Sequence, residues 1–161
     1  MSTEILPGPA IGFTPEQIDQ SASTRDVRQK WVVVVDEALP PGRAVNAAVC
    51  VAGATTAQVP GLLGADATDA DGTTYPGLPW LGCTVLGAPA ERLGALRAAA
   101  GRRTDVAVVA MPVAAQLTRV YDDYLEAVAS SAAEDLSFLA LSLVGPRKVV
   151  DRLVKGLGLL P

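Results

Sequence analysis

Two stretches of the sequence place basic side chains at the expected beginning of a helix. Arg43 follows the turn formed by residues 40–42, and Arg147 and Lys148 directly follow Gly145-Pro146. A helix N-terminus already carries partial positive charge, so cations there are unfavourable, whereas anions bind well to its free N–H groups. The pattern therefore predicts a binding site for a phosphate or carboxylate group. The alternative is that the three side chains simply extend into water.

The helix that begins near Arg43 adds two side chains to the same face. Spacings of three and four residues place Arg43, Asn46 and Cys50 along one side of that helix. A polar side chain in an otherwise apolar helix needs a partner, so Asn46 either orients a ligand or binds a backbone carbonyl as structural support. Gln116, at the expected start of a later helix, is a further candidate for hydrogen bonding to a ligand.

The chain contains no histidine, which excludes His-based acid–base chemistry, Ser-His-Asp triads and most zinc sites. Asp36, at the end of a predicted strand, and Cys50 remain as candidate catalytic residues, although Asp36 could equally pair with Arg43. Cys50 and Cys83 both lie in apolar contexts, which is typical of buried, reduced thiols. The acidic residues 66–72 lack the glutamate of a calcium-binding EF-hand loop. We therefore predict no metal site and no cofactor, and leave open whether the protein is an enzyme.

One strand–turn–helix unit positions most of these side chains. The continuous apolar run of residues 31–35 predicts a strand that is buried on both faces. A short break with two prolines follows, and Ala and Val dominate residues 42–54, which predicts a buried helix. In open α/β sheets, ligands bind where strands end and helices begin. If the first and last strands are neighbours, the turns that carry Arg43 and Arg147 face one crevice.

The rest of the chain continues this alternation. Apolar runs predict strands at residues 82–86, 105–111 and 138–144, and helical patterns cover residues 88–100 and 114–130 and the segment after Gly145-Pro146. The helix of residues 114–130 has one apolar face, formed by Leu117, Val120, Tyr121, Tyr124, Leu125 and Val128. Asp71-Gly72 predicts a β-hairpin in the irregular segment of residues 55–79. Tyr75, Trp80 and Cys83, in or beside that segment, could form a pocket wall or lid.

The alternation of strands and helices predicts an α/β protein. We expect a single domain at residues 30–161, built on a mixed, mostly parallel sheet of about four strands. Residues 1–29 are expected to form an N-terminal arm. Within it, the capping box from Thr14 to Gln17 predicts a short helix over about residues 15–21.

Composition narrows the range of functions. The net charge of −4 argues against nucleic acid as a partner, because such proteins usually carry a basic patch. No apolar run approaches the roughly 18 residues that a membrane span requires. The first residues also lack the basic-then-apolar order of a signal peptide. These features predict a cytoplasmic protein.

Four motifs resemble a bacterial family called domain of unknown function 2000 (DUF2000). They are KWVVVVDEALPPGRAVNAAVC, LLGADATDADG, YPGLPWLGCTVL and LALSLVGPRKVVDRLVKGLGLL, and together they span about residues 30–160. The family is similar in fold to the type-two peptidyl-tRNA hydrolases. The resemblance therefore implies a three-layer α/β/α sandwich and a homodimer.

The same resemblance implies that the hydrolytic residues are lost. Those hydrolases carry a turn with glycine and lysine, followed by a helix reading Ala-Ala-Gln-Cys-x-His. Gly42-Arg43 stands in for the glycine and lysine, and Cys50 falls on the cysteine. Val49 falls on the glutamine, and Ala52 falls on the catalytic histidine. The resemblance thus implies a retained scaffold without peptidyl-tRNA hydrolysis.

Three hypotheses about function follow. The first is a protein that binds a small or nucleotide-like molecule bearing phosphate or carboxylate, held by Arg43, Asn46, Gln116, Arg147 and Lys148. The second is a hydrolase or transferase that acts on an acyl ester or related conjugate through Asp36 or Cys50. The third is a homo-oligomeric interaction module, in which the Ala- and Gly-rich first helix packs against a second copy.

Overall fold

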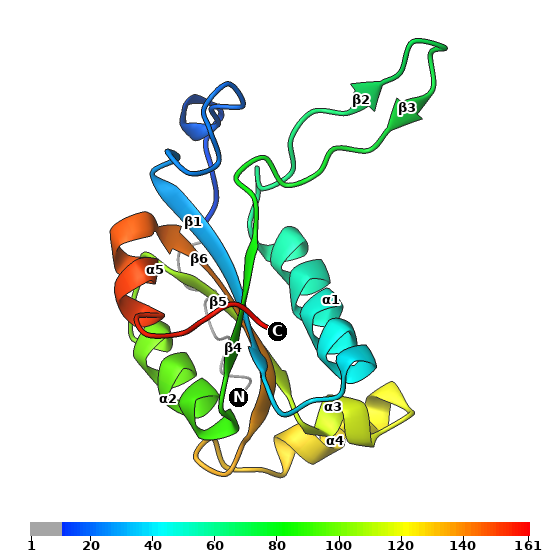
Figure 1. The fold of residues 1–161 in the computed structure, drawn as a ribbon. Helices are drawn as coiled ribbons and strands as arrows, with labels where there is room; N and C mark the ends of the chain where they lie inside the picture. Colours follow the sequence, from blue (N-terminus) through cyan, green and yellow to red (C-terminus); the bar gives the residue numbers. More distant parts are fainter. Residues whose placement is uncertain (1–10) are drawn as a thin grey trace, which may run out of the picture.

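The computed structural model describes residues 11–161, so residues 1–10 of the predicted N-terminal arm lie outside the described part. A four-stranded sheet in the order β4-β1-β6-β5 forms the centre of the fold (Figure 1). Its strands are β1 (Gln29–Asp36), β4 (Thr84–Ala88), β5 (Ala107–Pro112) and β6 (Phe138–Pro146). The pair β1–β4 is parallel, whereas β6 runs antiparallel to both β1 and β5. The sheet is mixed as predicted, but the expectation that it is mostly parallel is wrong.

Both faces of the sheet are covered by apolar side chains, which confirms the prediction for β1. Val33 and Val35 belong to the cluster that includes residues of α1 (Pro41–Gln58). Val32 and Val34 belong to the cluster formed with α2 (Ala90–Gly101) and α5 (Arg147–Leu153). Because successive side chains of a strand point to opposite faces, an uninterrupted apolar run suits a strand with helices on both sides.

A buried polar chain fixes α1 on the sheet. Trp31 Nε1 donates a hydrogen bond to Ser142 Oγ over 2.7 Å, and Thr55 Oγ1 lies 2.7 Å from the same oxygen. Thr55 and Ser142 are both buried, and Thr55 Oγ1 also lies 2.6 Å from the Val51 carbonyl oxygen. These bonds join β1, β6 and α1. Since a buried polar group without a partner is costly, this chain favours one alignment of the three elements.

The predicted burial of α1 holds for one face only. Ala44, Ala47, Val51 and Thr55 are its buried residues. In contrast, Val45 and Val49 keep 61% and 63% of their surface exposed. Cys50 is exposed as well, so the prediction of a buried thiol there is wrong.

The predicted helix of residues 114–130 is broken into α3 (Ala114–Leu117) and α4 (Tyr121–Ala129). Thr118 interrupts it with an extended backbone (ψ 155°), and its Oγ1 donates a hydrogen bond to the carbonyl of Ala114. A side-chain bond to the carbonyl four residues earlier slightly destabilises a helix and often bends it. The expected inward face is therefore largely in solvent, with Leu117 and Tyr121 each 73% exposed.

A hairpin extends past the C-terminal end of α1, away from α3 and α4 (Figure 1). We call residues 61–80 the projecting hairpin. It contains β2 (Ala67–Thr68) and β3 (Thr74–Tyr75), which confirms the hairpin predicted at Asp71-Gly72. Asp69 braces it by accepting hydrogen bonds from the backbone of Asp71 and Thr73 and from the Tyr75 hydroxyl. These bonds, above all that from Thr73, lower the pKa of Asp69 and favour its charged form.

The described part of the N-terminal arm packs on the rest of the fold. Its predicted helix is a 3-10 turn, η1 (Pro15–Gln17), in which Gln17 Oε1 accepts a hydrogen bond from the backbone of Thr14 over 2.9 Å. Phe13 is buried and meets the Trp80 ring edge-on at 5.4 Å. None of the helices in residues 11–161 combines the length and apolar character needed to cross a membrane.

Candidate functional site

The two turns that carry the predicted anion-binding cations lie at opposite ends of the sheet. β1 and β6 are neighbours, but their antiparallel register pairs Gln29 with Pro146 and Val35 with Ala140. The start of α5 therefore lies beside the start of β1, about 20 Å along the strand from the start of α1 at ~3.3 Å per residue. The prediction that Arg43, Arg147 and Lys148 face one crevice is wrong. An apolar run does not encode the direction of a strand, and the direction of β6 places the two turns at opposite ends of the sheet.

Arg147 uses its guanidinium within the chain. Its Nε donates to the carbonyl of Val27 over 2.8 Å, and its Nη2 donates to the carbonyl of Thr24 over 3.0 Å. Lys148, the next residue of α5, is exposed. Arg147 thus ties the N-terminal arm to the end of β6, which explains a basic residue at this helix start without an external anion.

The other three predicted ligand-binding residues do come together. Arg43 Nε donates a hydrogen bond to Gln116 Oε1 over 2.7 Å. Gln116 Nε2 in turn donates to the backbone carbonyl of Arg43 and to Asn46 Oδ1, both over 3.0 Å. Gln116 lies on α3 and its partners on the first turns of α1. The network thus connects the start of α1 with the segment that follows β5.

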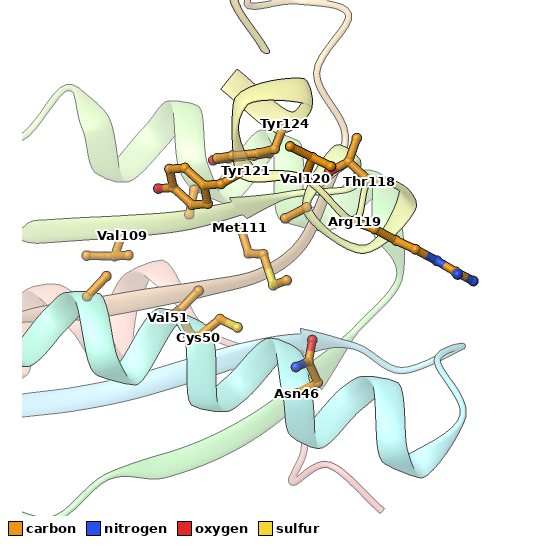
Figure 2. Close-up of a pocket in the computed structure, with 13 residues that line it drawn as sticks. Asn46, Cys50, Val51, Val109, Met111, Thr118, Arg119, Val120, Tyr121 and Tyr124 are labelled. Atoms are coloured by element: carbon orange, nitrogen blue, oxygen red, sulfur yellow. The ribbon is translucent and has the colours of Figure 1, made fainter. Parts of the chain in front are cut away.

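Beside this network lies a cleft between α1, β5 and the α3–α4 segment (Figure 2). It has a volume of about 510 Å³, which lies within the usual range for small-molecule sites of ~300–1,000 Å³. Its apolar lining includes Val51, Val109, Met111, Val120, Tyr121 and Tyr124, and its polar lining is Asn46, Cys50, Thr118 and Arg119. Figure 2 shows Cys50 and Met111 directed toward each other across the interior, with the two tyrosines along the opposite wall.

The cleft combines an aromatic surface with one charged side chain. Tyr121 and Tyr124 have ring centroids 5.4 Å apart, so they offer a contiguous aromatic surface. Arg119 is the charged residue of the lining, and Figure 2 shows it at the edge of the cleft with its guanidinium directed outward, away from the other lining side chains. The described lining contains no carboxylate, lysine or histidine. Its electrostatic preference is therefore for an anion or a carbonyl rather than for a cation.

The two candidate catalytic residues have different surroundings. Cys50 lines the cleft and is solvent-accessible. Asp36 is not among the lining residues, and its Oδ1 accepts a hydrogen bond from the backbone of Ala38 over 3.0 Å. Asp36 thus closes the turn after β1. No pair of described lining residues supplies both a nucleophile and a carboxylate or imidazole base.

The three residues expected at a pocket wall or lid do not line this cleft. Trp80 donates from Nε1 to the carbonyl of Gly61, and the hydroxyl of Tyr75 binds Asp69 within the projecting hairpin. Cys83 lies in a separate hollow beside Arg147. Partial burial of the thiol raises the pKa of Cys83 to about 11, but the residue as a whole is exposed, so the prediction of a buried cysteine is wrong here as well. None of the three therefore forms a wall or lid of the cleft, although Cys83 forms part of the wall of the separate hollow.

Sequence reasoning missed several residues of the cleft. Tyr121 and Tyr124 were expected to face the core, and Met111 to be part of a buried strand. Arg119 falls on the polar side of a continuous helix over residues 114–130, which would direct it away from the sheet. The break at Thr118 changes these directions. The only signal for the break is a pair of β-branched residues, Thr118 and Val120, and such residues are mildly unfavourable in helices.

The fold and the site define a single mixed α/β protein with an open, ligand-sized cleft beside its first helix. The chain belongs to the family described as protein of unknown function (DUF2000), whose model matches residues 29–161. The predicted family is thereby confirmed. Among solved structures, the chain is similar to the protein of unknown function Atu0240 from Agrobacterium tumefaciens strain C58. That match has a TM-score of 0.71 and 18% identity, and it covers 82% of this chain and 97% of the other. A search of curated proteins gave no match.

Proposed function

We propose that this protein binds a small molecule with an apolar or aromatic body and one phosphate or carboxylate group. The observation that carries the proposal is the composition of the cleft, in which apolar and aromatic walls are combined with a few polar groups and one arginine. This is the usual make-up of a small-molecule site. Arg147 and Lys148 are not part of the proposed site.

Each polar group has a distinct role in the proposal. Arg119, at the rim, binds the negative group of the ligand. Gln116 fixes Arg43 and Asn46 relative to each other, so that Asn46 can accept or donate a hydrogen bond without first being ordered. Tyr121 and Tyr124 contact the ligand body. A preorganised polar group loses less conformational entropy on binding, which favours affinity.

A fluorescence titration with 8-anilinonaphthalene-1-sulfonate tests this proposal, because the probe combines aromatic rings with one anionic group. We expect saturable binding to one site. Ala54→Trp should abolish it by filling the cleft from α1, and Arg119→Ala should weaken it about tenfold. Ala98→Trp, on the exposed side of α2, is the matched control and should bind normally. Unchanged binding by the Ala54→Trp protein would contradict the proposal.

We propose that this protein shares the scaffold of the type-two peptidyl-tRNA hydrolases but not their activity. We propose the three-layer α/β/α arrangement of that class, supported by apolar clusters on both faces of the sheet. We also propose a cytoplasmic location. Ala52 stands at the position of the hydrolases' histidine, so the proposed activity is binding rather than peptidyl-tRNA hydrolysis.

One observation favours the enzymatic alternative, a hydrolase or transferase acting on an acyl ester or related conjugate. Cys50 is accessible on the wall of the cleft, where a bound acyl group would lie. A cysteine nucleophile is activated by a neighbouring base or cation, and the cleft supplies only Arg119 at its rim. We therefore place ligand binding first. A Cys50→Ser protein that retained full turnover of an ester substrate would exclude the thiol mechanism.

A further inference from the structure

The outward face of α1 is apolar and carries almost no charge. Arg43 is the only charged residue among the 18 of the helix. Val45 and Val49 are well over half exposed, and a side chain at Gly53 would meet nothing within 4 Å. An exposed helix normally carries charged residues on its solvent face. A glycine inside a helix is also unfavourable relative to alanine, and nothing in the described residues 11–161 requires one at position 53.

The projecting hairpin also exposes apolar side chains, and its charge is opposite to that at the start of α1. Leu78 is 78% exposed, and Tyr75 and Leu63 are also exposed. Residues 60–81 contain three aspartates, Asp66, Asp69 and Asp71, and no basic residue. The first turn of α1, at the opposite end of the helix, contains Arg43 and no acidic residue. The hairpin is therefore negative, and the start of α1 is positive through both Arg43 and the helix dipole.

We propose that two copies of this chain associate through the outward face of α1, with the two helices antiparallel and each projecting hairpin lying beside the first turn of the partner's α1. A twofold axis makes such an interface self-complementary. Antiparallel packing brings the aspartates of one hairpin to the partner's Arg43, whereas parallel packing would place the two acidic hairpins together. Gly53 allows the two backbones to approach closely. The partner's hairpin then lies next to the cleft.

The inference does not depend on any ligand in the cleft. It rests on exposure and charge at α1 and the hairpin, so the ligand-binding proposal can fail while this one stands, and the reverse also holds.

Light scattering coupled to size-exclusion chromatography tests the interface with the full chain. Over concentrations of about 1–100 µM, which covers Kd values typical of moderate complexes, we expect the molar mass to approach twice the 16.5 kDa of one chain. Gly53→Arg should weaken association about 100-fold or more, because it places a long cation in the contact. Gly94→Arg is the matched control, because position 94 is also an open helical glycine but lies on α2. The Gly94→Arg protein should remain a dimer.

A charge reversal tests the position of the hairpin. Asp71→Arg should weaken association about tenfold, and combining it with Arg43→Glu should restore most of that loss. Asp71 is chosen because Asp66 and Asp69 brace the hairpin itself. A monomer at every concentration, or a dimer that is unaffected by Gly53→Arg, would overturn the proposed interface. A dimer that is sensitive to Gly53→Arg but not to the charge reversals would overturn the proposed position of the hairpin.

Discussion

Gln116 Nε2 lies 3.0 Å from Asn46 Oδ1, and this hydrogen bond joins two residues that are 70 positions apart. It answers one question that the sequence left open, because Asn46 has a side-chain partner on another element rather than a backbone carbonyl. Through Gln116, the start of α1 is connected to the segment that forms the other wall of the cleft. The cleft is thus framed by a network whose three members were all predicted site residues.

We expect Gln116→Ala to weaken binding of 8-anilinonaphthalene-1-sulfonate while leaving the fold intact. The variant releases Arg43 and Asn46, so a ligand must order both side chains, at about 0.5–1.5 kcal/mol for each. Because these groups are exposed, the free energy of unfolding should fall by no more than about 1 kcal/mol. Titration and urea denaturation measure the two effects. Equal affinity of wild type and variant would show that the network does not prepare the site.

The chain Trp31–Ser142–Thr55 should be the most sensitive polar feature of the core. Ser142→Ala removes the acceptor of the Trp31 indole N–H and a partner of Thr55, both within the buried interior. We expect the free energy of unfolding to fall by about 1–3 kcal/mol, the usual cost of leaving a buried polar group unsatisfied. Urea denaturation with Ser130→Ala, on the exposed end of α4, provides the comparison. A smaller effect for Ser142→Ala than for Ser130→Ala would contradict this account of the core.

Cys83 should react slowly with alkylating reagents. In a Cys50→Ser protein it is the remaining thiol, and its pKa of about 11 leaves little thiolate near neutral pH. At pH 8 we expect iodoacetamide to react roughly 10- to 100-fold more slowly than with the same protein in urea, since only the thiolate is nucleophilic. The rate should rise as the pH approaches 11. Equal rates in the folded and unfolded protein would exclude the raised pKa.

Arg147 is expected to hold the N-terminal arm in place. Arg147→Ala removes both side-chain donors to the carbonyls of Thr24 and Val27. Trypsin should then cleave at Arg25 or Arg28 several-fold faster, while residues 29–161 remain folded. Lys148→Ala alters the neighbouring charge without these contacts and should leave cleavage unchanged. Cleavage of the Arg147→Ala protein at the wild-type rate would show that the contacts do not secure the arm.

The sequence predicted the elements better than their arrangement. The run of valines at residues 32–35 identified β1, because burial on both faces leaves an unmistakable apolar pattern. The direction of β6 was not available from residues 138–144, since an apolar run reads the same in a parallel or an antiparallel strand. Because β6 runs antiparallel to β1, Arg147 lies far from Arg43, and the predicted two-turn anion site does not form.

The cleft itself was only half predictable. Arg43, Asn46 and Cys50 share a helix face by simple periodicity, so their association needed no tertiary information. The opposite wall depends on the break at Thr118, where a local side-chain hydrogen bond occurs within an otherwise helical pattern. Tyr121 and Tyr124 therefore appeared to be core residues. Their place beside the cleft follows from packing, which overrides local propensity.

A crystal structure of the protein grown with 8-anilinonaphthalene-1-sulfonate would test the central claim most directly. The account predicts electron density for the probe between α1 and α4, with its rings against Tyr121 or Tyr124 and its sulfonate within hydrogen-bonding distance of Arg119. Density for the probe only at another surface, with the cleft filled by water, would contradict it.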